Sequence, residues 1–115
     1  MKTTATRTIA LVSALLLSAA AHAGVELEDA FELSSTNVEL PASIGGSVIL
    51  RECSRCDRVT VRVRSESLYF IGKTPVTLAQ LRAAFDAREA RGETFGLVVF
   101  RDRASGFVSR IIIEL

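Results

Sequence analysis

Hydrophobic and polar residues alternate through the middle of the chain, most regularly over residues 58–64. Valine occupies every second position there, and threonine or arginine occupies most of the positions between, which is typical of a half-buried antiparallel strand. Two further apolar runs, at 47–52 and 67–72, are bounded by glycines or by a turn at 73–75 and also predict strands. The pattern therefore predicts three consecutive strands.

The periodicity changes to that of a helix after the third strand. Thr77 and Gln80 form the pattern of a capping box, in which the side chain of each residue bonds to the backbone of the other. The apolar positions that follow recur at helical spacing and form one stripe, made of Leu78, Leu81 and Phe85. We expect this stripe to pack on the chain's own sheet, and we expect Gly92 to end the helix.

The last part of the chain predicts a β-hairpin. Residues 94–101 and 106–115 are rich in β-branched and aromatic residues, and Gly106 suits the left-handed position of the turn between them. One face of the final strand carries Phe107, Ser109, Ile111, Ile113 and Leu115, and the other carries Val108, Arg110, Ile112 and Glu114. Because so apolar a strand needs shelter, we expect it near the centre of a sheet or within a closed barrel.

The predicted order is strand, strand, strand, helix, strand, strand. This is the element order of the OB-fold, a five-stranded, partly open barrel. From about residue 46 to residue 115 the chain resembles the small OB-like barrels of unknown function in exported bacterial proteins, in element order and turn placement. The resemblance implies a mainly β, α+β domain over residues 45–115. Its form would be either a five-stranded OB-like barrel or a strongly curved antiparallel sheet with the helix on one face.

The N-terminal region precedes this domain. Residues 1–23 have the form of a bacterial secretory signal, with a basic front region, an apolar run and small residues up to Ala23. We expect cleavage after Ala23 and a mature chain that is periplasmic or secreted. The apolar run is about half of the roughly 20 residues that a membrane-spanning helix needs, so no span is expected after cleavage. Residues 24–44 predict an acidic, partly ordered leader, either solvated or docked on the core.

Cleavage would change the chemistry that the chain can perform. The only histidine, His22, and the only methionine, Met1, would leave with the signal. Without an imidazole no side chain of ordinary pKa can serve a serine or cysteine nucleophile as a base near neutral pH, so we expect no catalytic residues and no enzyme activity. Loss of Lys2 and Arg7 leaves 12 basic residues against 13 acidic ones, and this balance gives no reason to expect nucleic-acid binding.

The two cysteines, Cys53 and Cys56, lie in the predicted turn between the first two strands. Thiols this close in an exported chain are expected to pair and staple the hairpin. A thiol-disulfide redox or thiol-sensing site is the first alternative, although thioredoxin-type sites place the first cysteine at a helix N-terminus. Handling of Cu(I) or zinc is the second. No histidine or methionine would complete such a ligand set, so we expect no bound metal and no cofactor.

Arginines are concentrated around the same hairpin. The guanidinium fork matches carboxylates and phosphates, and the second and third strands form the usual ligand face of an OB-like barrel. The candidate anion site comprises Arg51, Arg55, Arg58, Arg62 and Arg64, joined by Tyr69 if its register allows. The same arginines could instead pair with the acidic residues of 26–39 or remain solvated.

These observations predict a non-enzymatic, exported binding or accessory module. Its expected partner is an acidic protein or an anionic envelope component, such as a glycan or a lipid head group. No sequence feature indicates an oligomeric state.

Overall fold

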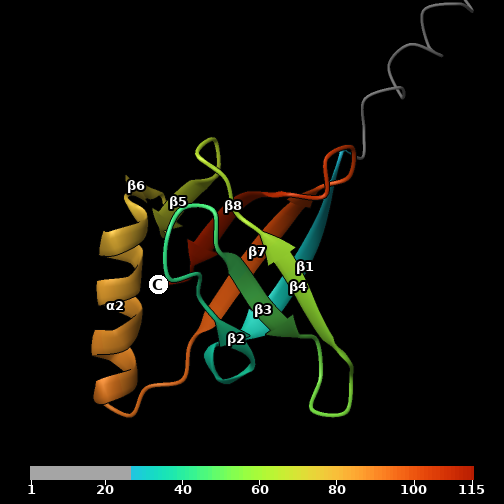
Figure 1. Cartoon of the computed structure of the whole chain (residues 1–115). Coiled ribbons are helices and arrows are strands. Elements are labelled where there is room, and N and C mark those ends of the chain that lie inside the picture. The colour runs from blue at the N-terminus through green and yellow to red at the C-terminus, as the bar shows by residue number, and fades with distance from the viewer. Residues whose placement is uncertain (1–26) are drawn as a thin grey trace, which may run out of the picture.

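The computed structural model describes residues 27–115, and the predicted signal with its cleavage site lies outside them. This part of the chain is mainly β with one α-helix, α2 (Leu78–Ala90), beside two sheets (Figure 1). The strands are β1 (Glu28–Ser34), β2 (Val38–Glu39), β3 (Ser47–Arg51), β4 (Arg58–Arg62), β5 (Leu68–Ile71), β6 (Thr74–Val76), β7 (Gly96–Asp102) and β8 (Val108–Ile113), and a 3₁₀ helix, η2 (Ser35–Asn37), joins β1 to β2. The expected α+β class is confirmed.

The strands form two separate sheets. The five-stranded sheet has the order β1-β7-β8-β5-β6, and the three-stranded sheet has the order β2-β3-β4. All neighbours are antiparallel except β5 and β8, which run parallel. The sheets do not close into the predicted barrel, because β4 ends at Arg62 and β5 pairs with β6 and β8 instead of with β4. Strands β1, β2 and β6 are additional to the five that were predicted.

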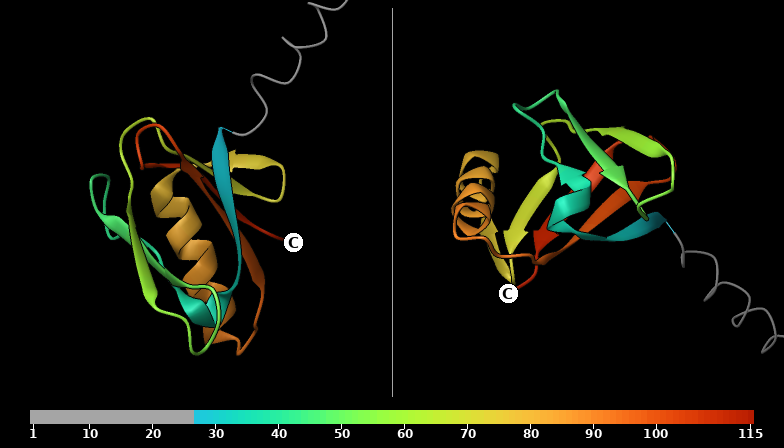
Figure 2. Two further views of the ribbon diagram at one scale, coloured as in Figure 1. Left: turned by 90° about the vertical axis from the view of Figure 1, so that its right-hand side faces the viewer. Right: turned by 90° about the horizontal axis from the view of Figure 1, so that it is seen from below.

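The hydrophobic core lies between the sheets and the helix. One row across the five-stranded sheet consists of the buried residues Phe31, Val99, Ile111 and Tyr69. The three-stranded sheet contributes Val48, Leu50 and Val61, and the helix contributes Leu78, Leu81 and Phe85. Figure 2 shows the helix and the small sheet on the same side of the large sheet. The predicted apolar stripe of the helix is therefore confirmed as a core surface.

Both ends of the helix follow the sequence prediction. The Gln80 N–H donates to the Thr77 hydroxyl at 3.1 Å, and the Thr77 N–H donates to the Gln80 side chain at 2.9 Å. These two bonds satisfy backbone donors that the first turn leaves unpaired. At the other end Gly92 has a φ of 77°, which closes the helix at little steric cost.

Strand β8 lies between β7 and β5, so the expectation of a central position is confirmed. The predicted division of its faces is wrong at one point. Phe100 pairs with Arg110 and Arg101 pairs with Val108, so Ser109 is an extra residue. Such a bulge shifts the alternation by one position. Val108 therefore faces the core, only 1% exposed, together with the fully buried Ile111.

The segment predicted as an acidic leader contains strand β1. It lies at the edge of the large sheet and pairs with β7 along its whole length. Phe31 and Leu33 point into the core, whereas Leu27 is 66% exposed. Asp29 receives hydrogen bonds from Arg101 and Arg103, and Glu28 receives one from Arg110. These two acidic residues are thus paired with arginines outside the candidate anion site.

Candidate functional site

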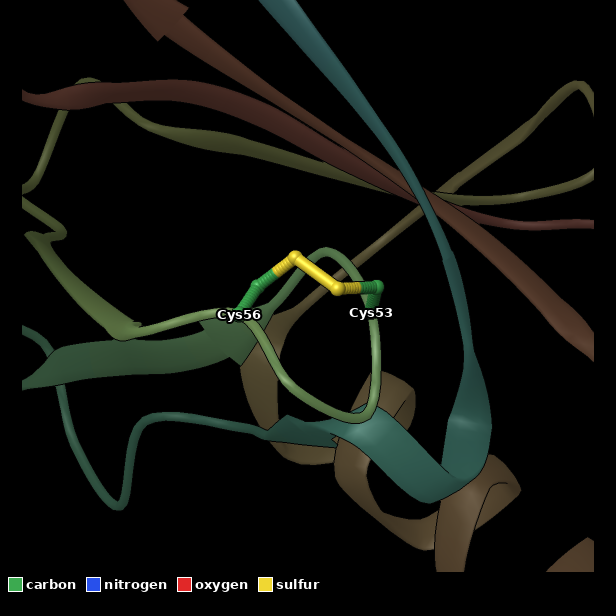
Figure 3. The surroundings of a disulfide bond; sticks show 2 residues. All are labelled: Cys53 and Cys56. Carbon is green, nitrogen blue, oxygen red and sulfur yellow. A yellow bond between two sulfur atoms is a disulfide. The ribbon is translucent and has the colours of Figure 1, made fainter.

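The cysteines lie at the tip of the β3–β4 hairpin (Figure 3). The Cys56 N–H donates to the Cys53 carbonyl oxygen at 3.1 Å, which closes a turn. The two sulfur atoms are at bonding distance, 1.99 Å apart, and the Cα atoms are 5.0 Å apart. The expected pairing is therefore confirmed in geometry, and the pair links the two strands that carry Arg51, Arg58 and Arg62.

The surroundings of the cysteines differ from those of thioredoxin-type sites. Cys56 is followed by strand β4, so neither sulfur lies at a helix N-terminus, where the dipole would stabilise a thiolate. Residues 27–115 contain no cluster of three or more His, Cys, Asp or Glu side chains that could hold a metal ion. A role for the pair in metal handling therefore has no supporting ligand set within the described residues.

Two arginines meet at the base of this hairpin. Arg51 on β3 and Arg58 on β4 are direct partners in the antiparallel ladder, so their side chains share one face. That face points away from the core, because residues at the alternate strand positions, Leu50 on β3 and Val61 on β4, point inward. We call Arg51 and Arg58 the arginine pair.

A small polar hollow of about 130 Å³ lies beside the arginine pair. Besides the two arginines, its lining includes Thr36 and Asn37 from η2 and Glu39 from β2. Arg58 donates to the Glu39 carboxylate at 3.3 Å, and both side chains are more than 60% exposed. The hollow therefore offers cationic and neutral polar groups together with a single carboxylate that engages one of the two cations.

The other arginines of the predicted site are not gathered with this pair. Arg55 is exposed in the cysteine turn. Arg62 is exposed on the outer face at the opposite end of β4, four residues and about 13 Å from Arg58 along the strand. The prediction of one continuous five-arginine site is therefore replaced by a pair with two separate exposed neighbours.

Arg64 has a different environment from the one predicted. Its guanidinium lies over the Phe107 ring, 4.8 Å from the ring centre, and its Nε atom is buried without a hydrogen bond. The nearest carboxylate oxygen, on Glu66, is 3.6 Å from that Nε, which is too long for a hydrogen bond. Arg64 thus packs against the β7–β8 hairpin and does not project freely as a ligand group.

Tyr69 does not join the arginines either. It is only 6% exposed and lies in the core row of the large sheet, opposite Ile111. Its register therefore places it on the inner face. Burial raises the pKa of Tyr69, and the neighbouring Ser67 hydroxyl offsets this only in part. The phenol oxygen forms no hydrogen bond of ordinary geometry within the described residues.

Sequence reasoning missed Thr36 and Asn37 as neighbours of the arginine pair. They lie on η2, in a segment that the sequence analysis treated as leader. The contact of Glu39, on the two-residue strand β2, with Arg58 is one of the pairings between the acidic residues of 26–39 and the arginines that the sequence analysis left open. The available signal was the alternation of Val38, Glu39 and Leu40, which is the pattern of a short strand with its acidic residue outward.

The ion pairs elsewhere have structural roles. Arg101 and Arg103 hydrogen-bond to Asp29 and hold its pKa below the ordinary value, and Arg91 and Arg88 do the same for Glu93. Arg88 also lies over the Phe95 ring at 4.2 Å. These arginines tie the helix end and the β1 edge to the fold.

Comparison with known proteins gave no relative. No protein-family model, curated protein or solved structure matches the chain. Within residues 27–115 no helix combines the length and the apolar character that crossing a membrane requires.

Proposed function

We propose that this chain is an exported, non-enzymatic binding module that holds an anionic group against the arginine pair. The recognised chemistry is a carboxylate or a phosphate, carried by an acidic protein or by an envelope glycan or lipid head group. The signal-like residues 1–23 support a periplasmic or secreted location, with which a paired Cys53 and Cys56 is compatible. The OB-like resemblance stays part of this proposal and rests on the element order predicted from the sequence.

The observation that carries the proposal is the direct opposition of Arg51 and Arg58 in the ladder. Like charges directly opposite on a sheet repel each other. Among residues 27–115 the pair receives one carboxylate, that of Glu39, and this carboxylate bonds to Arg58. An anion placed between the two guanidinium groups would relieve the repulsion and give Arg51 the charged partner that it lacks.

Glu39 would compete with such a ligand. Its carboxylate occupies one of the two donors that the ligand needs, and its negative charge opposes the approach of another anion. Replacing Glu39 with glutamine keeps the shape of the side chain and removes the charge. The proposal therefore predicts that Glu39→Gln binds anions more tightly than the natural chain, which is an unusual result for loss of a polar contact.

The experiment compares retention on an immobilised phosphate resin as salt concentration rises. The variant with both Arg51→Ser and Arg58→Ser should elute at lower salt and show a shallower salt dependence, because fewer counterions are displaced. A variant with both Arg62→Ser and Lys73→Ser, at exposed positions outside the hollow, changes net charge equally and serves as control. Equal loss of retention in both double variants, with unchanged retention of Glu39→Gln, would show that only overall charge matters and would overturn the proposal.

The thiol redox alternative is favoured by one observation, the exposure of Cys53 at the hairpin tip, because an attacked sulfur must be accessible. The reduction potential of the pair separates the two roles. A staple should have a potential below about −300 mV, whereas a disulfide donor should lie nearer to about −120 to −180 mV. A value in the second range would make redox exchange the primary function.

A further inference from the structure

The arginine pair is the last rung of the β3–β4 ladder, because β3 ends at Arg51 and β4 begins at Arg58. Leu50 and Val59 form the next rung inward, and on the other side the chain continues through the turn segment 52–57. The end of a ladder opens more easily than its middle, and two like charges opposite each other add to this tendency. The arrangement of the pair therefore depends on what holds the turn segment together.

The Cys53–Cys56 disulfide holds this turn segment together. Every residue of the segment is exposed except Cys56, which is half-buried. Within residues 27–115, the side chains at positions 52, 54, 55 and 57 form no hydrogen bond, ion pair or ring contact. The two sides of the segment are joined by the disulfide and by the 3.1 Å backbone hydrogen bond between the same two residues. Figure 3 shows the disulfide running across the loop, and each cysteine is two positions away from one arginine of the pair.

A thiol reductant can reach this bond. Cys53 is exposed at the hairpin tip, and exchange begins when a thiolate attacks one of the two sulfur atoms. With a dithiol reductant, the attack breaks the S–S bond and forms a mixed disulfide, which the second thiol of the reductant then resolves. Both cysteines end as thiols, having gained two electrons and two protons, and the reductant ends as a disulfide. The two sides of the turn segment are then joined only by the backbone hydrogen bond.

We propose that the Cys53–Cys56 disulfide controls the anion affinity of the arginine pair, so that the oxidised chain binds an anion more tightly than the reduced chain. This inference rests on the proposed anion-binding function of the pair. In the oxidised chain the turn is closed before the ligand arrives, and both arginine side chains are held on one face. In the reduced chain part of the binding free energy is consumed in ordering the end rung and the turn. Coupling between linked sites is typically about fivefold or more, and we expect a ratio of this size.

The coupling acts in both directions, because linkage between two binding or reaction sites is reciprocal. If the oxidised chain binds phosphate about fivefold more tightly, saturating phosphate stabilises the disulfide by the same factor. For a two-electron couple this factor lowers the reduction potential of the cysteine pair by about 20 mV. A disulfide that only staples the hairpin, without influence on the arginine pair, would have a reduction potential that does not respond to phosphate.

Phosphate titrations of the purified protein at constant ionic strength test the proposal, with the Nε–H resonances of Arg51 and Arg58 as the readout. The natural chain reduced with dithiothreitol should bind phosphate about fivefold or more weakly than the oxidised chain. The variant with both Cys53→Ser and Cys56→Ser should bind like the reduced chain and should not respond to dithiothreitol. Arg55→Ser is the matched control, because it removes an exposed charge from the same turn and keeps the disulfide. It should preserve the ratio between the oxidised and reduced affinities.

Amide hydrogen exchange shows whether the effect of reduction is local. Protection of the β8 amides, at the centre of the large sheet, should be the same in the oxidised and reduced chains. Exchange at the end of the β3–β4 ladder should become faster on reduction. Loss of protection throughout the core would overturn the proposal, because the disulfide would then stabilise the whole fold and not the arginine pair in particular.

The reduction potential of the cysteine pair, measured with and without saturating phosphate at equal ionic strength, gives the second test. It should fall by about 20 mV or more in the natural chain and should stay constant in the variant with both Arg51→Ser and Arg58→Ser. Equal phosphate affinities of the oxidised and reduced chains, with an unmoved potential, would overturn this inference and leave the anion site in place. If the oxidised natural chain binds phosphate no more tightly than the double arginine variant, the proposed function fails and this inference fails with it.

Discussion

The two sheets bury similar inner faces but have very different outer faces. The small sheet carries Arg51, Arg58, Thr60 and Arg62 on its outer side, and the hollow beside the arginine pair is polar. The large sheet carries aromatic and branched apolar residues on its outer side. The arginines of the small sheet's outer face line a polar hollow, whereas the apolar residues of the large sheet's outer face are mostly half-buried and lie beside Arg110 and Glu114. The comparison therefore assigns the candidate anion-binding groups to the small sheet.

The largest predicted effect separates the two faces of the large sheet. Ile111 is fully buried on the inner face, so Ile111→Ala should lower the free energy of unfolding by about 2 to 5 kcal/mol. Ile112, the next residue, lies on the outer face half-buried between Val98 and Phe70, and Ile112→Ala should cost less, about 1 to 2 kcal/mol. Urea unfolding at low protein concentration measures both. Equal losses would mean that a further element covers the outer face within one chain.

The next effect separates Arg62, the last residue of β4, from Arg64, two residues further along the chain. Arg64→Ser should destabilise the fold by about 1 kcal/mol, because it removes the guanidinium that packs over Phe107. Arg62→Ser, the matched control with the same charge change, should leave the unfolding midpoint nearly unchanged. Comparison of the two melting curves is sufficient. A larger loss for Arg62→Ser would mean that the outer face of β4 is structural and would weaken its assignment as a binding surface.

The smallest predicted effect is on the free energy of unfolding at alkaline pH, and it comes from Tyr69 on the inner face of the large sheet. Burial raises the pKa of Tyr69 from its ordinary value of 10.0, so above pH 10.0 the unfolded chain loses this proton while the folded chain still holds it. The contribution of Tyr69 to the free energy of unfolding should therefore be constant below pH 10.0 and should decrease as the pH rises above it.

Tyr69→Phe should remove this part of the alkaline loss. At neutral pH it should not destabilise the fold, because it removes a buried hydroxyl that has no hydrogen bond of ordinary geometry. Unfolding measured at neutral and alkaline pH, for both chains, gives the comparison. An unchanged alkaline loss in Tyr69→Phe would place its origin in another group.

The sequence was most informative where one periodicity dominated. The strict alternation of residues 58–64 and the capping box at Thr77 correctly predicted a strand and a helix start. The sequence pattern failed where hydrogen-bond pairing between distant segments decides which strands form and how the sheets are arranged. The acidic β1 becomes a strand because β7 offers a matching edge, and the pairing of β5 with β8 in a separate sheet keeps the small sheet from closing the barrel. Such long-range pairing is not encoded in a local pattern.

The candidate site was predictable in its chemistry but not in its extent. The concentration of arginines around the hairpin was visible in the sequence, whereas the register that sets Arg51 opposite Arg58 depends on where the ladder begins. The inward position of Tyr69 and the packing of Arg64 on Phe107 also follow from tertiary contacts. A sequence pattern can name candidate side chains, but it does not say which of them meet.

The most direct test of the anion site follows the arginine side chains themselves. Inorganic phosphate would be titrated into the protein while the side-chain Nε–H resonances of its arginines are recorded by nuclear magnetic resonance. Our account predicts that the Arg51 and Arg58 signals move together along one saturable curve, that Glu39→Gln shifts this curve to lower phosphate, and that exposed Arg55 and Arg91 barely respond. Equal, non-saturating shifts of all the exposed arginines would contradict it.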